Sequence, residues 1–286
     1  MGNIIDGKLV SAAVRASVAQ EVASLKEKEI SPSLAVILVG NNPASQVYVK
    51  NKQKACIETG ITPIQITMPE ETSECDLLNK IDELNADSSV HGILVQLPLP
   101  KHISEKNVIE RISPSKDVDA FTHDSVGRIV EGKYSFLPCT PAGIMKLLEY
   151  YNVDIEGKEC VIIGRSNIVG KPMALLMLNA SGTVTVCHSR TKELSEVTKR
   201  ADILVVAVGK AEFVTADMVK EGAVVIDVGI NRMPDGKLKG DVEFDGVSKV
   251  ASLITPVPGG VGPMTITMLM KNTLTSAKKF AEKKNK

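Results

Sequence analysis

The sequence contains no tryptophan, and its aromatic residues make up only 3% of 286 positions. Lysine plus arginine and aspartate plus glutamate both number 34, so the formal net charge at pH 7 is zero. A protein that stacks on bases needs aromatic rings, and one that holds nucleic-acid phosphates needs an excess of positive charge. We therefore expect no nucleic-acid partner.

Long apolar runs and cysteine motifs are absent as well. No apolar run approaches the ~20 residues of a membrane-spanning helix, and the opening MGNIIDGKLV lacks the regions of a secretory signal. The five cysteines form neither a CxxC pair nor a zinc-ligand spacing. We expect reduced, mostly buried thiols, no metal site, no membrane partner and a cytoplasmic location.

What the sequence does contain is an alternation of helical and strand patterns in its first third. Apolar residues at helical spacing predict a helix over 9–28. Apolar runs predict strands over 33–40, 61–68 and 90–100, and helices are predicted over 48–60 and 75–87, with the segment 41–45 as a loop. This order predicts a parallel sheet covered by helices, with ligands at the carboxyl ends of its strands.

A second series of elements follows residue 140. The segment 159–182 reads as strand, glycine turn and helix. Further strands are predicted over 183–189, 201–209 and 223–231, with helical or turn connections at 192–200 and 216–222, and a final helix over 264–284. The prediction is an α/β protein with two α/β domains around a cleft. Residues 1–120 with 266–286 form one domain, and 121–265 form a Rossmann-like domain.

The turn GRSNIVGKP has the context of a dinucleotide-binding turn, because it follows a strand and opens a helix. It departs from GxGxxG, since Ser166 takes the place of the second glycine and the next glycine, Gly170, comes one residue late. Gly164 still permits a tight turn, and the helix start still offers free N–H groups to a pyrophosphate. A plain strand-to-helix turn is the alternative.

The end of the second strand in this series favours NADP over NAD. An NAD site usually has an acidic residue there for the ribose 2′-hydroxyl. Here the segment reads VCHSRT, with Ser189 and Arg190, and Arg165 lies in the glycine turn. Arginines suit a 2′-phosphate. The alternative is that both arginines only face solvent, and the role of His188 stays open.

Tyr48 and Lys52 lie four residues apart in YVKNK, on one face of the predicted helix. An ordinary exposed helix face is one interpretation. A short-chain dehydrogenase pair, in which tyrosine gives the proton and lysine lowers its pKa, is another. Chain order argues against the second, because here the glycine turn follows the pair. Other polar candidates at strand ends are Gln96, Asp117 and Asp119.

Several blocks in chain order carry a family resemblance: IIDGK, YVKNK, GILVQLPLP, SPSKDVDAFT, LPCTPAGI, GRSNIVGKP, CHSRT, ADILVVAVG, DVGIN, GDV and TPVPGGVGPMT. Together they resemble the bifunctional methylenetetrahydrofolate dehydrogenase/methenyltetrahydrofolate cyclohydrolase family. Ala120 departs from the pattern, since the family commonly has glycine there.

The resemblance implies two reactions at one tetrahydrofolate site, with NADP as cofactor and no metal. The first is oxidation of 5,10-methylenetetrahydrofolate to 5,10-methenyltetrahydrofolate, and the second is hydrolysis to 10-formyltetrahydrofolate. It implies that Lys52 moves protons and activates water while Gln96 holds it. Tyr48 would stack on the aminobenzoyl ring, and Asp119 would bind the pterin. The resemblance also implies a homodimer.

By the same resemblance, one loop walls the folate pocket: Pro258, Gly259, Gly260, Val261 and Gly262. Residues implied to hold the cofactor are Gly164, Arg165, Ser166, Ser189, Arg190 and, beside the nicotinamide, Ile230. Two alternatives remain, a monofunctional NAD(P)-dependent dehydrogenase and a non-catalytic nucleotide-binding module. A Lys52→Met variant distinguishes them from the bifunctional enzyme, which predicts loss of the cyclohydrolase with the fold kept.

Overall fold

The computed structural model describes residues 2–284, which form two compact units. Within the described residues, the first α/β unit comprises 13–139 and 266–284, and the second comprises 2–12 and 140–265. The boundary at 265/266 coincides with the sequence-based one, whereas residues 121–139 and 1–12 group with the other unit. All three boundaries fall inside helices, α1 (Gly7–Lys26), α6 (Cys139–Tyr150) and α10 (Val261–Lys284), and the continuous helical pattern of α1 gives no sign of the one at 12/13.

The first unit contains a three-stranded parallel sheet in the order β3 (Thr62–Met68), β2 (Ser33–Val39) and β4 (Gly92–Val95). The connecting helices are α2 (Pro43–Thr59) and α3 (Glu74–Ala86), followed by α4 (Glu105–Arg111) and α5 (His123–Val130). All seven residues of the central strand β2 are buried, as a continuous apolar strand covered on both faces requires. The predicted βαβαβ order is confirmed.

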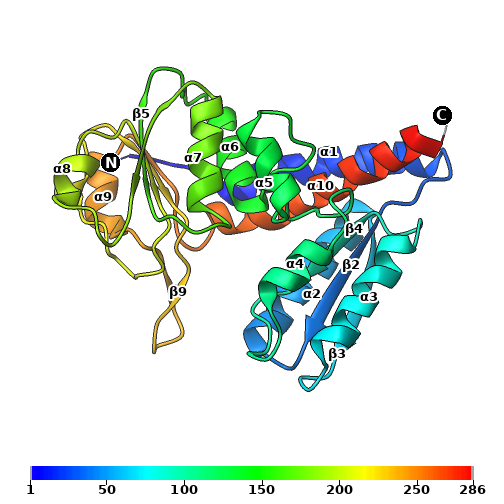
Figure 1. Ribbon diagram of the computed structural model, residues 1–286. Coiled ribbons are helices and arrows are strands. Elements are labelled where there is room, and N and C mark those ends of the chain that lie inside the picture. Colours follow the sequence, from blue (N-terminus) through cyan, green and yellow to red (C-terminus); the bar gives the residue numbers. More distant parts are fainter. Residues whose placement is uncertain (1, 285–286) are drawn as a thin grey trace. The chain divides into compact units, whose positions relative to one another are not determined.

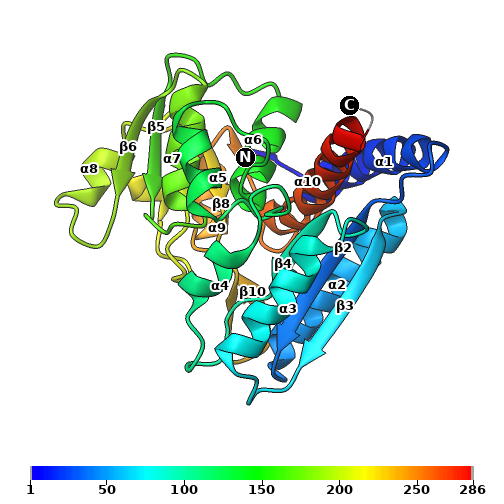
Figure 2. The same cartoon turned by 45° about the vertical axis from the view of Figure 1, so that its right-hand side comes forward.

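Alternation along β2 divides its side chains between two helical layers. Ala35, Ile37 and Val39 pack in a core cluster with apolar residues of α3 and α4. The intervening residues point to the other face, where α2 contacts β2 and β3. Figures 1 and 2 show α3 and α2 on opposite faces of this sheet. The carboxyl ends of β2 and β4 thereby lie near the first turns of α2.

Two sequence-based boundaries in this unit are wrong. The helix predicted to begin at Tyr48 begins five residues earlier, because α2 already starts at Pro43, within the segment 41–45 predicted to be a loop. Asn42 Oδ1 accepts hydrogen bonds from Ala44 N (3.0 Å) and Ser45 N (3.1 Å), and proline at the first helical position needs no N–H partner. The strand predicted over 90–100 is only Gly92–Val95, since the prolines that follow Gln96 donate no ladder hydrogen bonds.

The second unit contains a six-stranded sheet in which every pairing is parallel. Its order is β1 (Asn3–Ile4), β11 (Leu253–Ile254), β8 (Val224–Asp227), β7 (Ile203–Val206), β5 (Glu159–Ile163) and β6 (Thr183–Cys187). The chain goes from β5 to β6 on one side and then to β7 on the other. This reversal is the topological switch point at which open α/β sheets bind ligands.

Helices cover both faces of this sheet (Figure 1). One face packs against α8 (Leu194–Thr198), the 3-10 turn Ala216–Met218 and α9 (Phe244–Val250), and the other carries α6 (Cys139–Tyr150) and α7 (Gly170–Asn179). A two-stranded hairpin, β9 (Asn231–Arg232) with β10 (Leu238–Lys239), extends beyond β8. Across the described residues, no helix combines the length and apolarity needed to cross a membrane.

Candidate active site

Lys52 lies in the third turn of α2 and reaches the carboxyl end of β4. Its Nζ donates a hydrogen bond to Gln96 Oε1 at 2.9 Å. The Gln96 amide is itself oriented, because Nε2 donates to Leu97 O at 2.7 Å and the backbone N–H donates to Ile37 O at 2.8 Å. Tyr48, one turn earlier, exposes 44% of its surface. The lysine is therefore held by a residue at the end of a strand, whereas a lysine on an ordinary solvated helix face would have no such partner.

Asp119 and Cys139 complete a polar cluster around this lysine. Burial raises the pKa of Asp119, whereas the Lys52 ammonium and a hydrogen bond with the Cys139 thiol oppose that rise. The Cys139 Sγ is also 3.5 Å from Val118 O. Burial raises the pKa of this thiol well above its usual range, with the charge of Asp119 adding to the effect. Cys139 is thus a neutral partner of the carboxylate.

Loss of hydration lowers the pKa of Lys52, and the nearby charge of Asp119 opposes the decrease. Removing an ammonium from water disfavours its charged form, so a larger share of the amine is neutral at a given pH. A neutral amine beside an oriented amide can accept a proton. The cluster therefore contains a candidate general base.

The sequence did not indicate what holds Asp119 in place. Asn272, in the middle of α10, donates through Nδ2 to Val118 O at 2.8 Å and to Leu137 O at 2.9 Å. These carbonyls flank Asp119 and Cys139, so one amide ties their two chain segments together. Sequence reasoning missed both Asn272 and the role of Cys139, and the only available signal was the position of Cys139 within the LPCTPAGI block.

Asp117, the other carboxylate of this segment, has a structural role. Its Oδ2 accepts hydrogen bonds from Thr122 N (2.9 Å), Thr122 Oγ1 (2.8 Å) and Ser125 Oγ (2.7 Å). The side chain is buried and shapes the turn into α5. The same turn places Ala120 at φ +57°, a backbone region that favours glycine. The residue that departs from the family pattern thus occupies a position where glycine is less strained.

The glycine-rich loop and Ile230 come together in the second unit. They line a cavity of about 160 Å³ with residues of the β8 end and Lys8. The loop residues in it are Pro256, Val257, Pro258, Gly259, Gly260, Val261, Gly262 and Pro263. A Cβ at Gly7 would lie 1.7 Å from Gly260 O, so the IIDGK block needs glycine where α1 meets this loop.

The turn after β5 is built for close backbone contact. Gly164 has φ +123°, and a Cβ there would lie 2.2 Å from Ala207 O. A Cβ at Gly170 would lie 2.2 Å from Gly164 O. Ser166 Oγ accepts hydrogen bonds from Val169 N (3.2 Å) and Gly170 N (3.3 Å). The residue in place of the second glycine therefore shapes the start of α7.

The neighbouring strand β6 ends beside this turn, since Gly164 N donates to Cys187 O at 2.9 Å. None of residues 188–192 is acidic. Ser189, Arg190 and Arg165 are exposed. His188 Nδ1 accepts a hydrogen bond from Arg190 N at 3.2 Å, so the histidine side chain stabilises the turn that follows β6. Exposed guanidinium groups next to a glycine turn fit a dinucleotide with an additional phosphate.

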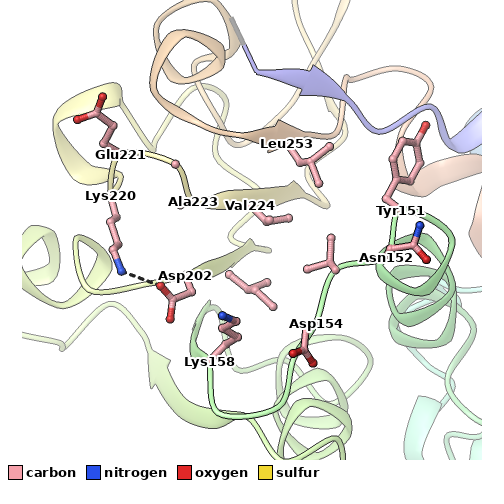
Figure 3. A pocket seen from close by; sticks show the side chains of 13 residues that line it. Tyr151, Asn152, Asp154, Lys158, Asp202, Lys220, Glu221, Ala223, Val224 and Leu253 are labelled. Atoms are coloured by element: carbon pink, nitrogen blue, oxygen red, sulfur yellow. Dashed lines mark hydrogen bonds and ion pairs between the residues drawn. The ribbon is translucent and has the colours of Figure 1, made fainter.

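A larger cavity of the second unit lies at the opposite, amino ends of β5, β7 and β8 (Figure 3). Its volume is about 390 Å³. Lys220 Nζ pairs there with Asp202 Oδ1 at 2.6 Å, and Lys158, Asp154 and Glu221 add charges of both signs. Because ligands of open parallel sheets bind at the carboxyl ends, this cavity is not the cofactor site.

Comparison with known proteins identifies the family. The model of the tetrahydrofolate dehydrogenase/cyclohydrolase catalytic domain matches residues 5–119, and that of the NAD(P)-binding domain of the same family matches residues 138–281. Together the two matches cover most of the chain.

The chain belongs to the tetrahydrofolate dehydrogenase/cyclohydrolase family.

Relatives in this family are similar over nearly their whole length. The chain is 62% identical over 275 residues to the bifunctional protein FolD of Halalkalibacterium halodurans, covering 96% of this chain and 98% of the relative. The crystal structure of the bifunctional FolD dehydrogenase/cyclohydrolase from Campylobacter jejuni superposes with a TM-score of 0.96, at 55% identity over 98% of this chain and 99% of that one. The Trypanosoma brucei enzyme, solved with NADP and an inhibitor, has a TM-score of 0.93, at 39% identity over 97% and 98%.

Family membership confirms the sequence-based resemblance and the α/β class. Within residues 2–284, no group of three or more His, Cys, Asp or Glu side chains is arranged to hold a metal ion. All five cysteines are free thiols, and four of them are buried, as the sequence predicted.

Proposed function

We propose that the protein is a bifunctional NADP-dependent methylenetetrahydrofolate dehydrogenase and methenyltetrahydrofolate cyclohydrolase. It oxidises 5,10-methylenetetrahydrofolate to the 5,10-methenyl cation, which it then hydrolyses to 10-formyltetrahydrofolate. One observation carries the proposal: Lys52, with its pKa lowered by burial, donates to Gln96 at 2.9 Å beside Asp119. The full-length similarity to bifunctional FolD proteins supports it.

In the hydrolytic step, Lys52 acts as the base. The methenyl carbon carries positive charge, so an adjacent ammonium is disfavoured and the neutral amine is the working form. The amine takes one proton from the attacking water as the new C–O bond forms. The second proton of that water then passes to the ring nitrogen N5 as its C–N bond breaks, which leaves the formyl group on N10. Gln96 keeps the amine at the site, because its own orientation is fixed by hydrogen bonds from Nε2 to Leu97 O and from the backbone N–H to Ile37 O.

Binding of the folate is assigned to groups of matching chemistry. Asp119 accepts hydrogen bonds from the amino and ring N–H donors of the pterin, with Cys139 beside it. The exposed ring of Tyr48 stacks on the aminobenzoyl group. The glycines of the loop Pro258 to Gly262, which lines a cavity of the second unit, permit close approach of a ligand to the backbone.

NADP is the proposed cofactor. When bound, it supplies the hydride acceptor for the methylene carbon. Gly164 and Ser166 shape the turn that receives the pyrophosphate, and Arg165, Ser189 and Arg190 hold the 2′-phosphate. Ile230 borders the nicotinamide, as a residue of the cavity near the glycine-rich loop. The complex of the Trypanosoma brucei relative with NADP supports this assignment.

The proposed partners are tetrahydrofolate derivatives and a second copy of the chain, without nucleic acid or membrane. The dimer is the one implied by the family resemblance. The proposed location is the cytoplasm, a reducing compartment, because the five cysteines are free thiols.

The first experiment is a spectrophotometric assay of the purified protein with 5,10-methylenetetrahydrofolate and either NADP or NAD, and then with the methenyl substrate alone. We expect reduction of NADP and loss of methenyl absorbance. Equal use of NAD would contradict the assignment of Arg190 and Ser189, and absence of both reactions would favour the binding-module interpretation.

Lys52→Met is the matched variant, because it keeps the length of the side chain and removes the amine. We expect cyclohydrolase kcat to fall by about 10²–10⁴ with an unchanged circular dichroism spectrum. Lys54→Met, an exposed lysine of the same helix, is the control and should retain activity. Unchanged hydrolysis in Lys52→Met would refute the role of Lys52.

A further inference from the structure

Two buried carboxylates lie outside the residues assigned so far, in the blocks DVGIN and GDV. Asp241 is fully buried, and its side chain accepts four hydrogen bonds. Oδ2 accepts hydrogen bonds from Val208 N (2.7 Å) and Gly209 N (2.9 Å). Oδ1 accepts hydrogen bonds from Lys210 N (2.9 Å) and Asn231 Nδ2 (2.8 Å). One side chain thus joins the loop after β7 to the hairpin strand β9.

Asp227, at the end of β8, holds Asp241 in turn. Its Oδ1 accepts hydrogen bonds from Gly229 N and Asp241 N, and its Oδ2 accepts one from Val242 N, all at 2.9 Å. Burial raises the pKa of Asp227 to about 6, with these backbone donors opposing the shift. The carboxylate is therefore mostly ionised at pH 7, as its three acceptor contacts require.

Two glycines make room for this pair. A Cβ at Gly229 would lie 2.3 Å from Asp241 Oδ1, and one at Gly240 would lie 1.8 Å from Asp227 Oδ2. Neither glycine has a left-handed φ. Their small size is needed for space beside the carboxylates and not for an unusual backbone conformation.

The linked segments occupy the carboxyl edge of the sheet. Residues 208–210 follow β7, next to the switch point, where Ala207 N donates to Ile163 O at 2.8 Å and Ala207 O approaches Gly164. Ile230 lies between Gly229 and Asn231, both of which contact the carboxylate pair. The network therefore spans the backbone below the proposed pyrophosphate and nicotinamide positions.

We propose that Asp241 is a positioning residue for NADP, which fixes the 208–210 loop and, through Asn231, the segment that carries Ile230. The inference rests on the proposed function. Asp241 belongs to the second unit, whereas the residues of the Lys52 cluster belong to the first. Loss of Asp241 therefore weakens NADP binding and spares hydrolysis of the methenyl substrate.

The test is Asp241→Asn, which keeps the shape of the side chain but turns an NH₂ group toward backbone N–H donors. We expect the NADP dissociation constant, measured by isothermal titration calorimetry, to rise about tenfold or more, as loss of hydrogen bonds to a buried charge implies. The KM for NADP should rise in parallel. The cyclohydrolase rate should change less than about twofold, because Lys52, Gln96 and Asp119 are unaltered.

Asp202→Asn is the matched control. Asp202 is a carboxylate at the amino ends of the same sheet, where it accepts Glu159 N at 3.0 Å and pairs with Lys220 (Figure 3). We expect its NADP dissociation constant to equal that of the wild type. Asn231→Ala removes a single donor to Asp241 and serves if Asp241→Asn does not fold. A smaller rise in the dissociation constant is expected for it.

An unchanged NADP dissociation constant in folded Asp241→Asn, or in Asn231→Ala, overturns the inference. Loss of hydrolysis in proportion to NADP binding overturns it too, because the residue would then act on the whole fold. If the wild type itself binds no NADP, the proposed function fails first and the inference falls with it.

Discussion

At the scale of single residues, Lys52 is governed by two opposing effects. Loss of hydration lowers its pKa, and the charge of Asp119 raises it. If the neutral amine is the base, cyclohydrolase kcat/KM should decrease about tenfold per pH unit below the pKa of Lys52 and level off above it. That pKa should lie below the ordinary lysine value of about 10.4. The measurement is a pH profile corrected for non-enzymatic hydrolysis.

The Asp119→Asn variant tests the direction in which Asp119 shifts the pKa of Lys52. Removing the negative charge removes an effect that raises the pKa of Lys52, so the midpoint of the profile should move to lower pH. Lys54→Met should leave the midpoint unchanged. A midpoint that moves upward in Asp119→Asn, or a flat profile in the wild type, would be incompatible with Lys52 as the base.

At the scale of elements, α10 supports the site from a distance in sequence. Asn272 is buried and donates to the carbonyls of Val118 and Leu137. Asn272→Leu keeps the branching of the side chain at Cγ but leaves both carbonyls without this donor, so the free energy of unfolding should fall by about 2–4 kcal/mol. We expect cyclohydrolase activity to fall further than stability explains, because the segments of Asp119 and Cys139 are no longer tied. Urea unfolding and kcat of the folded variant measure the two effects.

Ser276→Ala is the control within the same helix. Ser276 Oγ lies one turn later and contacts the carbonyls of His91 and Ser115, away from Asp119. It should lower stability with little effect on kcat. If both variants lost activity only in proportion to stability, the positioning role of Asn272 would be refuted.

At the scale of the whole molecule, the six-stranded sheet of the second unit has two edge strands, the two-residue β1 and the longer β6. On β6, Val186 exposes 38% of its surface. A β-branched edge strand without charges can pair with another chain. We expect sedimentation equilibrium to give twice the 30.6 kDa chain mass. Val186→Lys should shift the mass toward the monomer, because a lysine on the edge disfavours pairing.

Val130→Lys, an exposed position of α5 in the first unit, is the control and should remain dimeric. A monomeric wild type at micromolar concentration would refute the dimer itself. A dimer that persists in Val186→Lys would exclude β6 as the interface.

Sequence patterns determined the features that depend on neighbours along the chain. Apolar runs identified β2 and β5, because a strand covered on both faces needs apolar residues throughout. The glycine turn located the start of α7, since Gly164 must adopt φ +123° close to another backbone segment. The four-residue spacing placed Tyr48 and Lys52 one turn apart on α2. The family blocks in the sequence indicated the chemistry expected of the site.

Only the tertiary structure decided which distant residues meet. The contact between Asn272 and Val118 joins positions 154 residues apart, and the Asp241 side chain accepts hydrogen bonds from one loop and one hairpin strand. The inclusion of residues 1–12 in the second unit likewise has no local sign, because α1 continues across the boundary. Periodicity reports which face of an element is apolar. Buried hydrogen bonds between elements depend instead on how the packed faces align, and that alignment is fixed only when the chain folds.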